Sequence, residues 1–99
     1  MMRRAARVDA NQAEIVQALR DEGCSVWIIG IPLDALIGIN GRTALVEIKD
    51  GSKPPSARKH TKLQREFFES WKGGTVATIC DIEGARTLAR TLKGTHDHH

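Results

Sequence analysis

The sequence lacks tyrosine, contains only two cysteines and has no long apolar run in its 99 residues. No apolar stretch approaches the roughly 20 residues that a membrane-spanning helix needs. Arg3 and Arg4 near the start are not followed by an apolar segment, so we expect no secretory signal. Cys24 and Cys80 each lie in an apolar run, where reduced, buried thiols are more common than a disulfide. These absences favour a cytoplasmic protein.

The composition is typical of one small folded domain. Hydrophobic residues make up 40% of the chain and charged residues 27%, which are ordinary proportions for a globular protein. No internal repeat is visible in the sequence. We expect a flexible basic N-terminus over residues 1–8, a single domain over 9–93 and a disordered tail over 94–99.

The formal net charge of +3 hides an uneven distribution of charge along the chain. Residues 21–48 carry one basic and four acidic side chains, a net charge of −3. Residues 49–73 carry seven basic and three acidic side chains, a net charge of +4. An acidic segment followed directly by a basic one indicates a cation site beside a surface that binds anions.

The hydrophobic pattern predicts an α/β fold with the order helix, three strands, helix, strand, helix. A mixed sheet flanked by the helices is the expected architecture. Runs of apolar and β-branched residues bounded by glycine and proline mark the strands. The expected strands are 25–29, 33–39, 42–48 and 75–80.

Capping residues mark the expected starts of the helices. Asp9 is the expected N-cap of the first helix, with Gln12 as its capping-box partner, and this helix ends near Gly23. Thr61 caps the second helix, which closes at a pair of glycines. Asp81 caps the last helix, which ends near residue 92.

The dipeptide Asn40-Gly41 is the strongest turn signal in the sequence and predicts a two-residue hairpin between the second and third strands. With these two residues in the turn, Asp34 lies directly opposite Glu47. Their Cβ atoms would then be about 5 Å apart, where like charges repel each other. A cation between the two carboxylates would remove that repulsion.

The alternation of side chains along the third strand groups the charged residues on one face. Lys49 is two residues after Glu47 and therefore points to the same face. The opposite face is expected to enter the core through Ala35, Ile37, Val46 and Ile48. Two carboxylates and an ammonium group suit Mg²⁺ or Mn²⁺ with a bound water and phosphate oxygens. A cross-strand salt bridge on a solvated face is the alternative interpretation.

The spacing from Asp34 to Glu47-Ile48-Lys49 resembles the signature of the PD-(D/E)XK nuclease superfamily. The order of helices and strands is similar to the αβββαβα restriction-endonuclease-like core of that superfamily. The chain further resembles the phage-type VRR-NUC nucleases and the archaeal Holliday-junction resolvases, over about residues 10–92. Its compact size and two helical segments carry this likeness: Glu14, nine residues before Gly23, and Leu63-Gln64 with Phe67 and Phe68.

The resemblance implies roles for the residues that match the signature. Asp34 and Glu47 would bind Mg²⁺ or Mn²⁺ together with the carbonyl of Ile48, and Lys49 would be the catalytic lysine. Glu14 would approach from the first helix as a further metal ligand, directly or through water. Gln64 would support the catalytic site from the second helix. A solvated helix surface is the alternative for both Glu14 and Gln64.

One position departs from the family pattern. The proline that usually precedes the aspartate is Pro32 here, and Leu33 separates it from Asp34. Because neither residue takes part in the chemistry, the implied catalytic residues are unaffected.

A basic segment follows the third strand and is expected to contact DNA phosphates, which position a duplex without reading its bases. Its alternative is a merely solubilising surface. Arg3, Arg4 and Arg7 form either a second basic arm or a plain flexible terminus. The expected DNA-binding residues are Lys53, Arg58, Lys59, Lys62 and Arg65.

The aromatic residues Phe67, Phe68 and Trp71 form one helical stripe, which favours packing in the core or at a subunit interface. Cutting two strands needs two active sites, so we expect a homodimer or higher homo-oligomer. His96, His98 and His99 form a metal-binding tail or a plain flexible end.

These observations predict a metal-dependent endonuclease that hydrolyses DNA phosphodiester bonds, structure-specific for branched DNA such as Holliday junctions. The resemblance places it in a bacterial or phage-infected host cell. The alternative is a non-catalytic DNA-binding module on the same fold. A small phosphoesterase acting on nucleotides is the third hypothesis, and the extended basic segment disfavours it.

Overall fold

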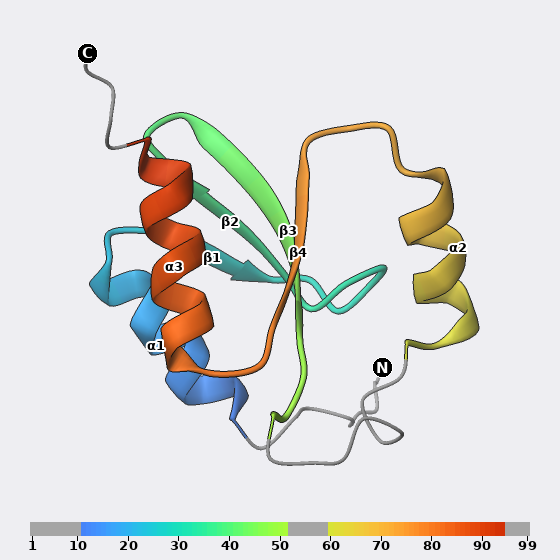
Figure 1. Cartoon of the computed structure of the whole chain (residues 1–99), viewed down its shortest axis with the longest axis horizontal. Coiled ribbons are helices and arrows are strands. Elements are labelled where there is room, and N and C mark those ends of the chain that lie inside the picture. The colour runs from blue at the N-terminus through green and yellow to red at the C-terminus, as the bar shows by residue number, and fades with distance from the viewer. Residues whose placement is uncertain (1–10, 52–59, 95–99) are drawn as a thin grey trace.

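A four-stranded mixed sheet forms the centre of the computed structural model, which describes residues 11–51 and 60–94. The strands lie in the order β1-β2-β3-β4; the first two pairings are antiparallel and the β3–β4 pairing is parallel. α1 and α3 lie on one side of the sheet and α2 on the other (Figure 1). The elements are α1 (Gln12–Asp21), β1 (Ser25–Ile28), β2 (Ala35–Ile39), β3 (Arg42–Ile48), α2 (Lys62–Ser70), β4 (Thr75–Ile79) and α3 (Ile82–Lys93).

The predicted α/β class, element order and mixed sheet are confirmed. The main difference in the strand boundaries is at β2, which begins two residues later than expected. Residues 31–34 form a bend before the strand, and the N–H groups of Ile29 and Gly30 both donate to the carbonyl of Asp34. Leu33 is fully buried although it lies outside the strand. No helix within residues 11–51 and 60–94 is long and apolar enough to cross a membrane.

The hairpin between β2 and β3 has the predicted turn and register. Asn40 and Gly41 both have positive φ, at 57° and 78°, as a type I′ turn requires. The pairing runs from Ile39 opposite Arg42 to Ala35 opposite Val46. The turn therefore determines which residues of β2 and β3 share a face.

The core lies between the sheet and the pair of helices α1 and α3. The four strand positions expected to face the core are all buried there. They pack with apolar residues of both helices. The largest fully buried apolar side chains in this cluster are Ile15, Leu19, Ile37, Val46 and Ile48.

The start of α1 differs from the sequence prediction. Asn11, not Asp9, occupies the N-cap position, and Asp9 lies outside the described residues. The Asn11 side chain does not cap the helix; its Nδ2 donates to the carbonyls of Lys49 at 3.1 Å and Cys80 at 2.8 Å. These bonds attach the N-terminus of α1 to the C-terminal ends of β3 and β4.

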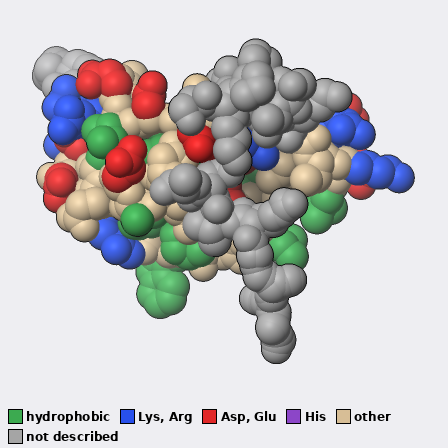
Figure 2. All heavy atoms as spheres, turned by 90° about the horizontal axis from the view of Figure 1, so that it is seen from below, with side chains coloured by type: hydrophobic (Ala, Val, Ile, Leu, Met, Phe, Trp, Pro, Cys, Tyr) green, Lys and Arg blue, Asp and Glu red, His purple; other side chains and the backbone are tan. Residues whose placement is uncertain are grey.

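The α2 side of the sheet is sparsely covered. No residue of α2 is buried, so its aromatic stripe does not enter the core, and the other expected location, a subunit interface, stays a prediction. Phe67 and Trp71 instead stack on each other, with ring centroids 5.1 Å apart. Trp27 and Ile31 are more than 70% exposed. Hydrophobic side chains also gather along the lower edge of the face in Figure 2.

Cys24 and Cys80 are not joined in a disulfide, as expected. Cys24 is buried, and burial raises the pKa of its thiol above the ordinary value. Cys80 is half-buried. The expected flexible segments 1–8 and 95–99 lie outside the described residues, whereas Gly94, the first residue of the expected tail, ends α3 in a left-handed conformation.

Replacing Asn11 by Asp tests the attachment of α1, because it keeps the shape of the side chain and removes both donors. We expect the free energy of unfolding to fall by about 1–3 kcal/mol, since a carboxylate would face the two carbonyls. Urea denaturation followed by circular dichroism measures this. The matched control is Gln12→Glu, an amide-to-acid change one residue away. Equal losses in the two variants would contradict the assignment.

Candidate active site

A buried carboxylate lies near the C-terminal end of β3. Among residues 11–51 and 60–94, Glu47 is the one charged side chain that is buried, with no exposed surface. Its neighbours Val46 and Ile48 enter the core, so strand alternation directs Glu47 to the opposite face of the sheet. Two basic side chains meet it there: Lys49 Nζ lies 3.0 Å from Oε2, and His60 Nδ1 lies 2.6 Å from Oε1.

These two contacts are close in distance but are not aligned as hydrogen bonds. Both carboxylate oxygens of Glu47 and Nδ1 of His60 are buried without a hydrogen-bond partner in the described part of the chain. Burial of a charge is costly unless the charge is paired and its lone pairs are satisfied. Glu47 is paired by charge, but its oxygens keep the capacity to bind a further cation.

Asp34 is held at the same end of the sheet by the backbone of β3. Its Oδ2 accepts the N–H of Ile48 at 2.6 Å, and its own N–H donates to the carbonyl of Val46 at 3.0 Å. The predicted pairing of Asp34 with Glu47 is not part of the ladder, which ends at Ala35, because the chain turns away from β2 at this residue. The carboxylate nevertheless lies against the Glu47–Ile48 peptide.

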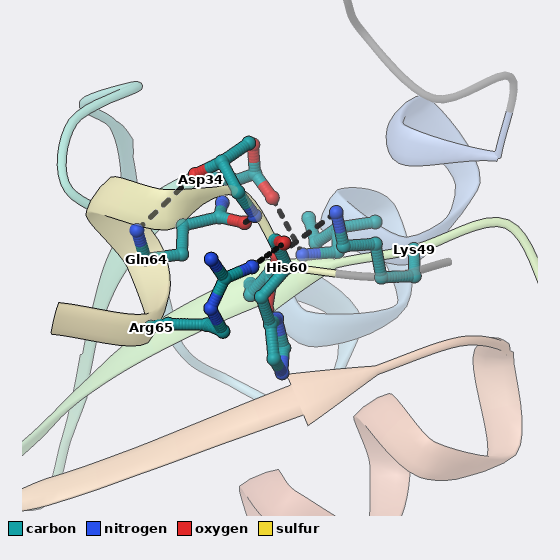
Figure 3. A network of polar contacts seen from close by, with 8 residues as sticks. Asp34, Lys49, His60, Gln64 and Arg65 are labelled. Carbon is teal, nitrogen blue, oxygen red and sulfur yellow. Dashed lines mark hydrogen bonds and ion pairs between the residues drawn. The ribbon is translucent and has the colours of Figure 1, made fainter. Parts of the chain in front are cut away.

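The candidate residues of the two strands are therefore brought together. Asp34 and Lys49 lie around a common point with His60 (Figure 3). Figure 3 also shows Gln64 and Arg65 beside this network, on α2. Asp34 precedes β2, Glu47 lies on β3 and Lys49 follows it, and His60 approaches from just before α2.

The Gln64 side chain caps the N-terminus of its own helix, α2. Its Oε1 accepts the N–H of Thr61 at 3.0 Å, and the Thr61 hydroxyl accepts the N–H of Gln64 at 3.1 Å. This is a capping box, which satisfies two N–H groups at the start of α2. The pattern Thr-x-x-Gln already marks such a box in the sequence. The Oε1 atom of Gln64 is thus engaged by the backbone at the start of its own helix.

Glu14 is exposed on α1. In residues 11–51 and 60–94, no three His, Cys, Asp or Glu side chains gather closely enough to form a complete metal cage. An open site with two carboxylates and waters is the arrangement that remains for a divalent cation.

The expected DNA-binding residues are only partly within the described chain. Lys62 and Arg65 are exposed on α2, and Arg65 Nη1 donates to the carbonyl of His60 at 3.2 Å. Lys53, Arg58 and Lys59 lie outside the described residues. Lys62 and Arg65 thus place two positive charges at the start of the helix that His60 connects to Glu47.

His60 is the site residue that sequence reasoning missed. It immediately precedes the Thr61 cap, and its ring packs on Phe68 with centroids 4.7 Å apart. The sequence signal that could have found it is its place directly before the capped start of α2, because the cap fixes the backbone next to it. Its partner Glu47 belongs to a different element, so spacing alone did not reveal the contact.

A shallow apolar groove of about 200 Å³ lies on the same face of the sheet but nearer the other end of β3. Leu36, Leu45 and Trp71 line it, and the carboxylates do not. It is therefore separate from the candidate active site.

Comparisons with protein-family models, with curated proteins and with solved structures find no match to this chain. The function is accordingly inferred from the residues and their geometry.

The pairing of Glu47 can be tested by replacing Lys49 with Met, which keeps the length of the side chain and removes its charge. We expect the free energy of unfolding to fall by about 3 kcal/mol, because a fully buried carboxylate loses a cationic partner. The exposed Lys72→Met is the matched control and should change stability by less than about 0.5 kcal/mol. Similar stabilities of the two variants in urea denaturation would refute the pairing.

Proposed function

We propose that the protein is a metal-dependent endonuclease of the PD-(D/E)XK type that hydrolyses DNA phosphodiester bonds, with branched DNA as its preferred substrate. The observation that carries the proposal is the buried Glu47 carboxylate, paired with Lys49 two residues later, while Asp34 accepts the N–H of the intervening Ile48. A buried carboxylate costs stability unless a cation compensates its charge, and a bound metal ion would do so together with Lys49.

The residues present fit a hard divalent cation. Asp34 and Glu47 would hold Mg²⁺ or Mn²⁺ with the carbonyl of Ile48. Glu14 forms no three-residue cluster with them in the described structure, so it would add a ligand from α1 through water. The buried oxygens of Glu47 lack hydrogen bonds, as expected of oxygens that bind a metal ion. Sites for Mg²⁺ commonly use one or two carboxylates and leave the other positions to water and phosphate oxygens.

Lys49 supplies the second part of the chemistry. When bound, the metal would lower the pKa of a water molecule and neutralise charge that develops on the phosphate. The ammonium group of Lys49 lies on the same face as the Glu47 carboxylate and 3.0 Å from it. In this position it can orient the attacking water and stabilise developing negative charge. Glu47 in turn fixes the position of the ammonium group.

Basic residues beside the site would bind the nucleic acid. Lys62 and Arg65 are exposed on α2, next to the helix start that packs over Glu47. With Lys53, Arg58 and Lys59 they would contact phosphates along a duplex arm and bring the scissile bond to the carboxylates. A homodimer would supply one active site for each strand, and the host would be a bacterial or phage-infected cell.

Cleavage of a labelled four-way junction in Mg²⁺ and in Mn²⁺ tests this function, with linear and flap substrates beside it. We expect Asp34→Asn, Glu47→Gln and Lys49→Met each to reduce the cleavage rate at least about a hundredfold, because each removes charge stabilisation from the transition state. Glu69→Gln and Lys72→Met change exposed residues of the same types and should cleave at the wild-type rate.

The same assay separates the competing functions. Equal background cleavage by the wild type and by Lys49→Met on all substrates would refute the enzyme. If such a protein still bound DNA, it would be a non-catalytic DNA-binding module. Hydrolysis of mononucleotides without cleavage of any DNA would indicate a small phosphoesterase.

The DNA surface has its own test, the salt dependence of junction binding in Ca²⁺, which avoids cleavage. Affinity should fall as salt rises, and charge reversal at Arg58, Lys59 and Lys62 should reduce the slope of log K against log[salt] by roughly one for each phosphate that is no longer neutralised. Arg86→Glu on α3 is the control for a change in net charge. An equal change in slope for the control would move the DNA surface elsewhere.

A further inference from the structure

The imidazole of His60 is positioned at the buried carboxylate. Its Nδ1 lies 2.6 Å from Oε1 of Glu47, although the side chain is 35% exposed overall. The ring is held from two directions: it packs on Phe68, and the adjoining Thr61 is fixed as the N-cap of α2. The orientation of Nδ1 toward Glu47 is thus built into the start of the helix.

The atoms that face each other are incompletely satisfied. Oε1 of Glu47 and Nδ1 of His60 are buried and make no well-aligned hydrogen bond in the described part of the chain. Two atoms with lone pairs this close share a proton, and a divalent cation bound to both would take the place of that proton as the two atoms move slightly apart. Oε2 is already paired with Lys49, so Oε1 is the carboxylate oxygen that faces the imidazole.

We propose that Nδ1 of His60 is a ligand of the divalent cation that binds Glu47, and that it makes the site favour Mn²⁺ and similar transition ions over Mg²⁺. This inference rests on the metal site of the proposed function and adds a ligand to it. Carboxylate and carbonyl oxygens suit Mg²⁺ and Mn²⁺ alike, whereas an imidazole nitrogen favours transition metals. The mixed donor set therefore predicts selectivity.

The site would remain open after this addition. The described residues contain no cage of three side-chain ligands, so Glu47 and His60 form its starting pair, with Asp34 anchored nearby on the N–H of Ile48. Water and phosphate oxygens would complete the coordination. Lys49 would stay on Oε2, which leaves Oε1 for the metal.

Isothermal titration with Mn²⁺ and with Mg²⁺ tests the proposal on the full chain. The chain has four histidines, and His96, His98 and His99 could bind metal independently. All measurements therefore use a background in which these three are changed to Asn. Against that background, His60→Asn should weaken Mn²⁺ binding at least about tenfold and Mg²⁺ binding less than about twofold. Glu47→Gln should weaken the binding of both metals.

Electron spin-echo spectroscopy of bound Mn²⁺ provides a second measurement, and its decisive result comes from the background protein, in which His60 is unchanged. Modulation from a directly bound ¹⁴N nucleus is expected in the background protein and should be absent in His60→Asn. If the background protein binds Mn²⁺ without nitrogen modulation, the proposal is overturned, and His60 is only an ion-pair partner of Glu47. An unchanged ratio of Mn²⁺ to Mg²⁺ affinity in a folded His60→Asn would overturn it as well.

The outcomes distinguish this proposal from the nuclease proposal. Binding of Mn²⁺ that depends on His60, without cleavage of any DNA, would support the ligand and refute the nuclease. Cleavage that requires Asp34, Glu47 and Lys49, with metal selectivity independent of His60, would support the nuclease and refute the ligand.

Discussion

The burial of the Glu47 carboxylate is the physical constraint on which the arrangement of the candidate site depends. Val46 and Ile48 must enter the core between the sheet and its two helices, so the residue between them must project from the opposite face. On that face a carboxylate excluded from water requires polar or charged partners. Lys49 comes from the same strand, and His60 comes from the segment that leads into α2. The alternation of side chains along β3 thus determines which partner groups the neighbouring segments must provide for Glu47.

This requirement also explains the position of α2. The helix buries none of its residues, and its aromatic side chains pack mainly on one another. The contact between His60 and Glu47 joins its N-terminus to the sheet, while the capping box of Thr61 and Gln64 stabilises that end of the helix. Lys62 and Arg65 are thereby held near the carboxylates. A cation at Glu47 would alter the contact that holds the helix, so the proposed metal binding and the position of the basic residues would be linked.

The N-terminus of α1 and the end of β3 meet through a second polar contact. Asn11 donates to the carbonyl of Lys49, which follows the strand, and to that of Cys80 after β4. Asp34 binds the N–H of Ile48 from the other side. The backbone that carries Glu47 and Lys49 is therefore fixed by side chains from two other segments, which favours a well-defined geometry for the groups that we propose to be catalytic.

The sequence by itself determined the order of the elements, the hairpin register and the two faces of β2 and β3. Each follows from local physics: positive φ at Asn40-Gly41 fixes the turn, and alternation then assigns Ala35, Ile37, Val46 and Ile48 to the core. Only the tertiary structure decided that His60 meets Glu47, that Asn11 serves the strands rather than its helix, and that α2 stays outside the core. These contacts join residues that are far apart in the sequence and that become neighbours only in the folded chain. The spacing of residues within one segment therefore does not predict them.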